Sequence, residues 1–263
     1  MSLGFAAAGR GRPIVIAHRG GALLGPENTA AAFAAAAAAG ADMLETDLRL
    51  TRDDHLVCVH DADLKRLTGD SGTVAGTDLA TLRELLPDLL TLDEALVASQ
   101  PLGLLLDVKL MDGAVLPPIL TAIRSAGAGR RCLLGLRHES LISAARTLDP
   151  AVAILAFATD PDSPSAARAA GANWFRLWQG EATPARIAAI GAAGLKAAIM
   201  VGQPRSIPGP GYPPFPVGRI DAEGIEQVLA LRPDAVLLDD PHLLAGVRGV
   251  TPLSSNCGKA SAS

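Results

Sequence analysis

Several features that would place a protein in a specialised class are absent from this 263-residue sequence. The three cysteines, Cys58, Cys132 and Cys257, lie far apart and form no C-x-x-C motif, which argues against a disulfide framework and against a zinc site. No stretch approaches the roughly 20 apolar residues of a membrane helix, and residues 1–12 lack the apolar segment of a signal peptide. We therefore predict a cytoplasmic protein without stable membrane insertion.

A strong excess of charge of one sign is also absent. The 23 basic and 27 acidic residues give a formal net charge of -4, which provides no electrostatic reason to expect a nucleic acid or an anionic membrane as partner. Hydrophobic residues make up 49% of the chain and charged residues 19%, a composition that allows a large core and does not indicate disorder. We expect a globular protein with a small-molecule partner, and the sequence indicates no oligomeric state.

Short strand-like runs alternate with helix-like stretches along the whole chain, which predicts βα units. Asn28 is the predicted N-cap of the first helix and Gly40 its stop, and Thr91 with Glu94 predicts a capping box. Eight such units without a composition break favour a TIM (β/α)8 barrel, a single domain over residues 1–250, with a doubly wound open sheet as the alternative. The predicted barrel strands are 13–17, 42–48, 103–109, 132–136, 152–157, 173–178, 195–201 and 235–238.

Three segments fall outside this repeat. Residues 51–90 follow the second barrel strand and contain an extra strand-like run at 55–60, so we predict a small inserted subdomain there. Residues 203–218 are rich in proline and glycine and follow the seventh strand, where a lid or a subunit contact would lie. The small and polar residues 251–263 predict a poorly ordered tail.

Polar side chains gather at the ends of the first two strands, the place where barrels carry their active sites. His18 and Arg19 end the first strand, although such a pair can also be purely structural. Glu45 and Asp47 are two residues apart on the second strand, so both carboxylates point to one side. Two like charges there favour a hard divalent cation, and an exposed acidic strand end is the alternative.

Polar residues also stand at the ends of two further predicted strands. Asp107 and Lys109 are again two residues apart, so Asp107 can join the oxygen-rich site while Lys109 faces an anionic substrate, unless the two form an ordinary ion pair. His60 with Asp61 closes the extra strand, where a core histidine held by a carboxylate is the alternative.

A later strand adds candidate substrate-binding residues. Arg176 and Trp178 share one side by alternation, and Trp178 could hold a cationic head group by a cation–π contact, with core packing as the alternative.

Taken together, these motifs resemble the glycerophosphodiester phosphodiesterase family, whose members share the phosphatidylinositol phospholipase C-like phosphodiesterase barrel. The likeness covers most of the chain and is looser in its second half. It rests on His18-Arg19-Gly20, Pro26-Glu27-Asn28-Thr29, Gly40-Ala41-Asp42, Glu45-Thr46-Asp47, Thr51-Arg52-Asp53-Asp54, His60-Asp61, Arg66-Leu67-Thr68, Gly72-Thr73-Val74, Thr91-Leu92-Asp93-Glu94 and Asp239-Asp240-Pro241.

This resemblance implies a metal-dependent hydrolysis of glycerophosphodiesters to glycerol 3-phosphate and an alcohol. It implies one divalent metal ion, Mg²⁺ or Ca²⁺ with Mn²⁺ as a further candidate. The residues that it implies are His18 and His60 as general acid and base, Glu45, Asp47 and Asp107 as metal ligands, and Arg19 and Lys109 at the substrate phosphate.

The sequence departs from the family pattern at two places. Asp107 stands where the family usually has a glutamate followed two residues later by lysine, and the shorter side chain retracts the carboxylate by about one C–C bond. The seventh strand ends in residues 199–202, Ile-Met-Val-Gly, where members often have a Trp-Thr-Val-Asn-like ending. The alternatives are therefore a phospholipase D-like or sphingomyelinase-like lipid phosphodiesterase, and a phosphodiester-binding barrel with weakened catalysis.

Overall fold

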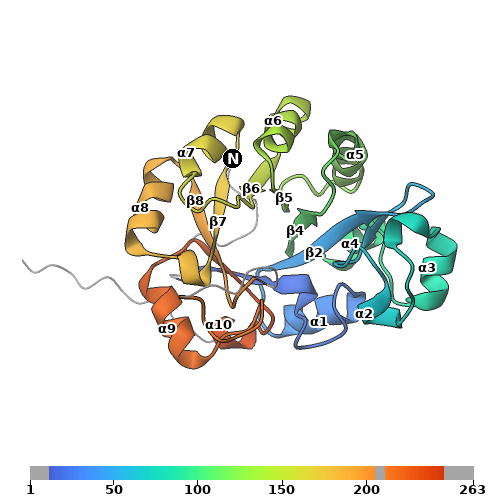
Figure 1. The fold of residues 1–263 in the computed structure, drawn as a ribbon, viewed down its shortest axis with the longest axis horizontal. Helices are drawn as coiled ribbons and strands as arrows, with labels where there is room; N and C mark the ends of the chain where they lie inside the picture. Colours follow the sequence, from blue (N-terminus) through green and yellow to red (C-terminus); the bar gives the residue numbers. More distant parts are fainter. Residues whose placement is uncertain (1–11, 205–210, 246–263) are drawn as a thin grey trace, which may run out of the picture.

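The computed structural model describes residues 12–204 and 211–245, and eight parallel strands of this part close into a barrel (Figure 1). Around the ring the order is β1, β2, β4, β5, β6, β7, β8 and β9, and pairing of β1 with both β2 and β9 closes it. All eight predicted barrel strands are confirmed. They are β1 Ile14–Ala17, β2 Met43–Leu50, β4 Gly103–Val108, β5 Cys132–Leu136, β6 Ala153–Ala156, β7 Trp174–Trp178, β8 Lys196–Met200 and β9 Ala235–Leu238.

Each barrel strand leads to a helix that lies on the outside of the ring (Figure 1). Alternate strand residues point into the barrel, where Leu105, Leu133 and Leu155 form part of a buried apolar interior. Their neighbours Leu104 and Leu106 belong to a second core, which packs the helices onto the strands. The helices are α1 Ala30–Ala38, α4 Leu92–Ala98, α5 Leu116–Ser125, α6 Glu139–Leu148, α7 Pro164–Ala170, α8 Pro184–Ala192, α9 Ala222–Ala230 and α10 His242–Ala245.

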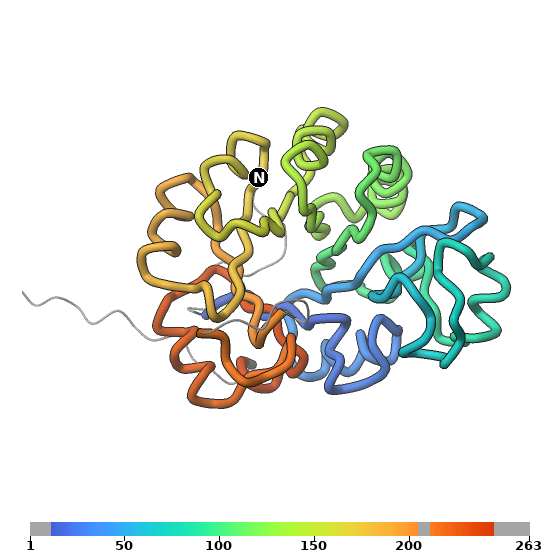
Figure 2. The backbone as a smooth tube through the Cα atoms, in the orientation of Figure 1, coloured from blue at the N-terminus to red at the C-terminus, as the bar shows by residue number. Residues whose placement is uncertain are grey.

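The insertion after β2 projects from one side of the barrel, in cyan in Figure 2. Its strand β3, Leu56–Cys58, confirms the extra strand predicted there and pairs antiparallel with the end of β2. The remaining elements are α2 Lys65–Thr68, η2 Val74–Gly76 and α3 Leu79–Leu85. A small apolar cluster of its own holds the insertion together, formed by Val57, Val59, Leu64, Val74, Leu82 and Leu89.

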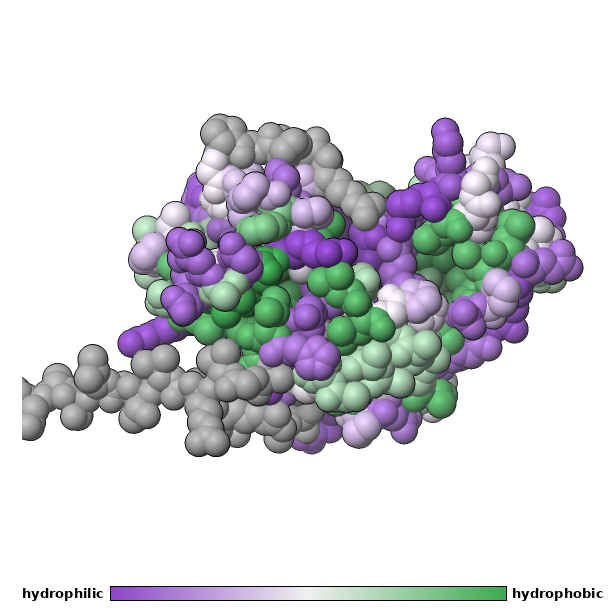
Figure 3. Space-filling model, turned by 90° about the horizontal axis from the view of Figure 1, so that it is seen from below, coloured by the Kyte–Doolittle hydropathy of each residue, from purple (hydrophilic) through white to green (hydrophobic). Residues whose placement is uncertain are grey.

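The ends of α1 follow the prediction only in part. Gly40 takes a φ of 87°, the left-handed conformation of a helix stop, as predicted. The predicted N-cap was wrong, because the hydroxyl of Thr29 accepts the cap hydrogen bond from the backbone of Ala32. The Asn28 side chain is instead committed to residues of β2. The exposed alanines of α1 form the pale green area in the lower middle of Figure 3.

The structure also bears on the predictions for one helix cap, the cysteines, the membrane and the C-terminal tail. The capping box of Thr91 and Glu94 is confirmed. Cys58 and Cys132 are buried and make no disulfide with one another. None of the helices in residues 12–204 and 211–245 has both the length and the apolar character that crossing a bilayer requires. The predicted tail 251–263 lies outside the described residues, and so does the middle of the segment 203–218.

Two glycine substitutions test the packing behind the barrel mouth. A Cβ atom at Gly135 on β5 would lie 2.0 Å from the Phe157 ring, so Gly135→Ala should lower the free energy of unfolding by about 1–3 kcal/mol through overpacking. Gly191 in α8 has no atom within 4 Å of such a Cβ, so Gly191→Ala should raise it by about 0.5–1 kcal/mol. Urea unfolding of both variants measures the difference, and equal midpoints would contradict this packing.

Candidate active site

A cavity of about 640 Å³ opens at the carboxyl ends of the barrel strands. Of the nine site residues predicted from sequence, eight line it: His18, Arg19, Glu45, His60, Asp107, Lys109, Arg176 and Trp178. The ninth, Asp47, is fully buried directly behind the wall, where it joins Glu45 and Asp107. The barrel thus brings together residues from strands that are widely separated in the sequence.

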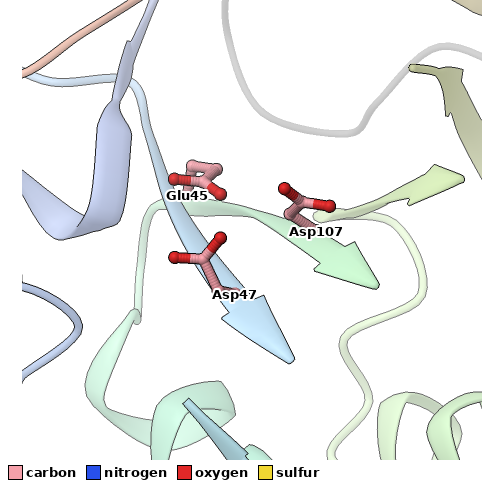
Figure 4. A group of neighbouring side chains, drawn as sticks. All are labelled: Glu45, Asp47 and Asp107. Carbon is pink, nitrogen blue, oxygen red and sulfur yellow. The ribbon is translucent and has the colours of Figure 1, made fainter. Parts of the chain in front are cut away.

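The acidic residues form a compact cluster (Figure 4). Glu45 and Asp47 project from the same side of β2, and Asp107 on β4 lies directly beside Asp47 in the strand register. One carboxylate oxygen from each residue lies within 4.8 Å of the others. Their exposed fractions are only 2%, 0% and 5%, so three carboxylates share a site from which water is largely excluded.

Positive and polar groups surround the two aspartates. The Lys109 ammonium lies 2.9 Å from Asp47 Oδ1 and also bonds Asp107. The Arg137 guanidinium donates hydrogen bonds to Asp107 from two nitrogens, one of which lies 2.8 Å from Oδ2. The Asn28 amide donates to Asp47 Oδ2 at 3.0 Å. Lys109 therefore points into the carboxylate cluster. It forms the ion pair with Asp107 that the sequence offered as the alternative to a contact with the substrate.

These neighbours separate the acidities of the three carboxyl groups. Burial raises the pKa of Glu45 well above its ordinary value, and the charges of Asp47 and Asp107 raise it further. Burial also acts to raise the pKa of Asp47, but Lys109 and His60 hold it below its ordinary value. Ionisation of Glu45 is therefore disfavoured beside the two charged aspartates, and a cation bound between the three carboxyl groups would favour it.

Two histidines face the cavity, and each is held by a carboxylate. The Nδ1 atom of His18 lies 2.7 Å from Asp239 Oδ1, and that of His60 lies 2.6 Å from Asp61 Oδ1. With Nδ1 engaged, the other ring nitrogen is left for a ligand. Burial, with the charge of Lys109, lowers the pKa of His60 to about 4, so its imidazole is neutral near pH 7 and can accept a proton.

Arg19 is almost completely buried and makes contacts within the protein. Its side chain is 2% exposed and pairs with Glu27, with nitrogen–oxygen distances of 3.1 and 3.2 Å. Its backbone takes a φ of 50°, a strained conformation for a residue other than glycine, and its N–H donates to Glu45 Oε2 at 2.6 Å. Arg19 therefore positions Glu45 through its backbone while its guanidinium reaches the cavity wall.

The residues predicted for the substrate pocket contact each other. The Arg176 guanidinium carbon lies 4.7 Å from the centroid of the Trp178 ring. The indole face that we expected to hold a ligand's cation is thus covered by a cation of the chain itself. Tyr212, from the Pro-rich segment, donates its hydroxyl hydrogen to Glu181 at 2.9 Å and also lines the cavity.

Sequence reasoning gave no site role to three residues of this network. Asn28 was interpreted as a helix cap, although its side chain also accepts a hydrogen bond from Thr46. Asp239 was noted only as a family motif. The sequence pattern does not single out Arg137, although this residue directly follows the fourth barrel strand, β5, where site residues are expected.

The donor set fits a hard divalent cation, because it consists of three buried carboxylates within reach of one ion. Asp47 Oδ1 is buried, and its recorded partner within the described residues is the Lys109 ammonium at 2.9 Å, so this oxygen already binds a cation. The fold and the site together define an α/β-barrel protein with an acidic cluster suited to a metal ion, flanked by two carboxylate-bound histidines.

Comparison with known proteins shows what part of the chain is similar to. Residues 18–131 match the model of the glycerophosphoryl diester phosphodiesterase family. A Mycobacterium tuberculosis protein named probable glycerophosphodiester phosphodiesterase 1 is 53% identical over 75 residues, which are 28% of this chain and 27% of that relative. A lysophospholipase D of Rattus norvegicus is 47% identical over 78 residues, 30% of this chain and 24% of that relative. The N-terminal half of the chain is therefore similar to this family, and these alignments span about a quarter of the length of the curated relatives.

Solved structures agree on the fold. An Oleispira antarctica phosphodiesterase, described in complex with the product sn-glycerol-3-phosphate, superposes with a TM-score of 0.70 at 23% identity. The alignment covers 88% of this chain and 94% of that one. The similarity therefore confirms the TIM barrel over the length of the described chain.

The acidic cluster can be tested by metal binding without any substrate. Asp47→Asn removes one buried charge with little change of shape, so it should weaken Mn²⁺ binding more than about tenfold in isothermal titration calorimetry. Asp93→Asn, on the exposed side of α4, is the matched control and should bind as the wild type does. Equal affinity of all three proteins would show that the ion binds elsewhere.

Proposed function

We propose that the protein hydrolyses glycerophosphodiesters to glycerol 3-phosphate and an alcohol, with one divalent metal ion, Mg²⁺ or Ca²⁺ and also Mn²⁺. The main support for this proposal is the arrangement of acidic residues and histidines at the mouth of the barrel. Three buried carboxylates that fit a metal ion share the mouth with two histidines, each held by its own carboxylate, and residues 18–131 match the model of a phosphodiesterase family.

Glu45, Asp47 and Asp107 would hold the metal ion. A divalent ion bound there supplies Lewis acidity and neutralises negative charge on a phosphate oxygen. The residues of the chain have their own part in holding the phosphate. Arg19 and Lys109 line the same cavity and contribute positive charge beside the cluster.

The histidines perform the proton transfers in this proposal. One imidazole takes the proton from the attacking hydroxyl group or water, and the other delivers a proton to the leaving alcohol. Asp239 and Asp61 fix the ring orientations and stabilise the protonated forms. A neutral imidazole at His60 near pH 7 suits the proton-accepting role.

The cavity suits a small substrate. Its volume of about 640 Å³ lies within the range of sites for small molecules. The Oleispira antarctica structure is described with sn-glycerol-3-phosphate, the product that this reaction releases. A second candidate, hydrolysis of a lysophospholipid, has the support of the rat lysophospholipase D relative. Including lysophosphatidylcholine in the substrate panel distinguishes lysophospholipid hydrolysis from glycerophosphodiester hydrolysis.

Turnover tests the proposal directly. Purified protein with Mg²⁺, Ca²⁺ or Mn²⁺ should release glycerol 3-phosphate from a panel of glycerophosphodiesters, measured with a glycerol-3-phosphate dehydrogenase-coupled assay. EDTA should abolish the release, and added metal should restore it. An absence of hydrolysis across the whole panel with every metal would defeat the enzyme proposal and favour a phosphodiester-binding barrel with weakened catalysis.

Histidine variants test the catalytic roles. His18→Ala and His60→Ala should each reduce kcat by about 10²–10⁴-fold, because each removes one proton-transfer group. His55→Ala is the matched control, since His55 lies in the insertion with 52% of its side chain exposed and pairs only loosely with Asp53 at 3.7 Å. Should either site variant retain wild-type kcat, the two-histidine mechanism would be wrong.

A further inference from the structure

Arg176 is a buried cation without adequate compensation. It is 7% exposed, and its Nη1 atom has no hydrogen-bond partner within the described residues. Its Nη2 reaches only the Ala158 carbonyl oxygen, at the long distance of 3.5 Å. The nearest carboxylate oxygen recorded, on Glu181, lies 3.9 Å from Nη1.

Glu181 is already committed to other donors. Its carboxylate accepts hydrogen bonds from the backbone of Trp178 at 3.0 Å and from the Tyr212 hydroxyl at 2.9 Å. Burial lowers the pKa of Arg176 to about 10, so the guanidinium still carries its charge at neutral pH. A buried charge of this kind is costly unless an anion pairs with it, and the cavity is the open side.

A second guanidinium lies close by. The guanidinium carbons of Arg137 and Arg176 lie 5.3 and 5.6 Å from the centroid of the Phe157 ring. The three residues come from the neighbouring strands β5, β6 and β7 or directly follow them, and all three line the cavity. Gly135 leaves room for the ring, since a Cβ atom there would overlap it. The aromatic wall therefore holds two cations at one side of the mouth.

Arg176 lies across the barrel from the acidic residues of β2, whereas Arg137, at the near end of the wall, bonds Asp107 of the acidic cluster. In the ring of eight strands, β7 lies four positions from β2, which carries Glu45 and Asp47. A substrate whose phosphodiester lies at the cluster and the histidines would extend its alcohol portion toward Arg176. Guanidinium groups pair well with phosphate and carboxylate oxygens, and Arg176 already covers one face of the Trp178 ring.

We propose that the Arg176 side of the cavity is a second anion subsite, so that the preferred phosphodiester carries a further phosphate monoester or carboxylate on its alcohol. Arg176 donates to that group, while Arg137 remains paired with Asp107 at the other end of the wall. This inference rests on the proposed function, because it takes the phosphodiester to lie at the acidic cluster and assigns the Arg176 side of the cavity to the alcohol portion. It reverses the expectation from the sequence that Trp178 holds a cationic head group.

Matched substrate pairs provide the test. Glycerophosphoinositol 4-phosphate differs from glycerophosphoinositol by one phosphate, and glycerophosphoserine differs from glycerophosphoethanolamine by one carboxylate. The wild type should prefer the anionic member of at least one pair by about tenfold or more in kcat/KM, and the pair with the larger preference identifies the anion. Arg176→Met should bring that ratio close to one.

Controls separate charge from structural damage. Arg176→Lys keeps the charge and should restore part of the preference, which a purely structural role of the arginine would not predict. Arg124→Met removes a cation on the exposed surface of α5 and should leave the ratio unchanged. Circular dichroism establishes that each variant is folded.

The outcomes distinguish this inference from the proposed function. Equal kcat/KM within both pairs, or a preference for the members that lack the additional anionic group, would overturn the second subsite while leaving the hydrolase in place. If no diester is hydrolysed, the proposed function fails, and calorimetry with inositol 4-phosphate and phosphoserine still decides the subsite. Binding that Arg176→Met weakens at least tenfold supports it, and no binding to the wild type refutes it.

Discussion

Three carboxylates buried at adjacent strand ends set the conditions for the rest of this site (Figure 4). Like charges removed from water cost several kcal/mol each unless cations or hydrogen bonds compensate them. Lys109 and Arg137 compensate Asp47 and Asp107, and burial raises the pKa of Glu45 instead. The shorter Asp107, where the family usually has glutamate, is the carboxylate that both cations bond. This one buried carboxylate is therefore paired with two cations.

The insertion belongs to the same electrostatic system. Arg66 in α2 bonds both Asp61, the partner of His60, and Glu27, the partner of Arg19. This chain of ion pairs connects the insertion to the end of the first barrel strand. We propose that residues 51–90 form a supporting subdomain whose task is to hold His60 at the cavity. Its small separate core would stabilise that position without contributing to the barrel interior.

Local patterns were sufficient for most of the fold. Buried parallel strands consist of short apolar runs between turn signals, which is why β5 and β9 have the residue bounds expected of them. The N-cap of α1 was wrong for an equally physical reason. Asn28 has the right side chain for a cap, but its amide bonds Thr46 and Asp47, and this tertiary contact leaves the cap to Thr29.

The sequence by itself determined which side chains share a strand face, because side chains alternate with a period of two. That rule places Glu45 with Asp47, and it places Arg176 with Trp178. Only the tertiary structure decided what meets these pairs. Closing the barrel brings Asp239 to His18 across 221 positions of sequence. It also brings Arg137 to Asp107, and this contact depends on the register of the two neighbouring strands. The alternation of side chains along one strand does not determine the register between strands.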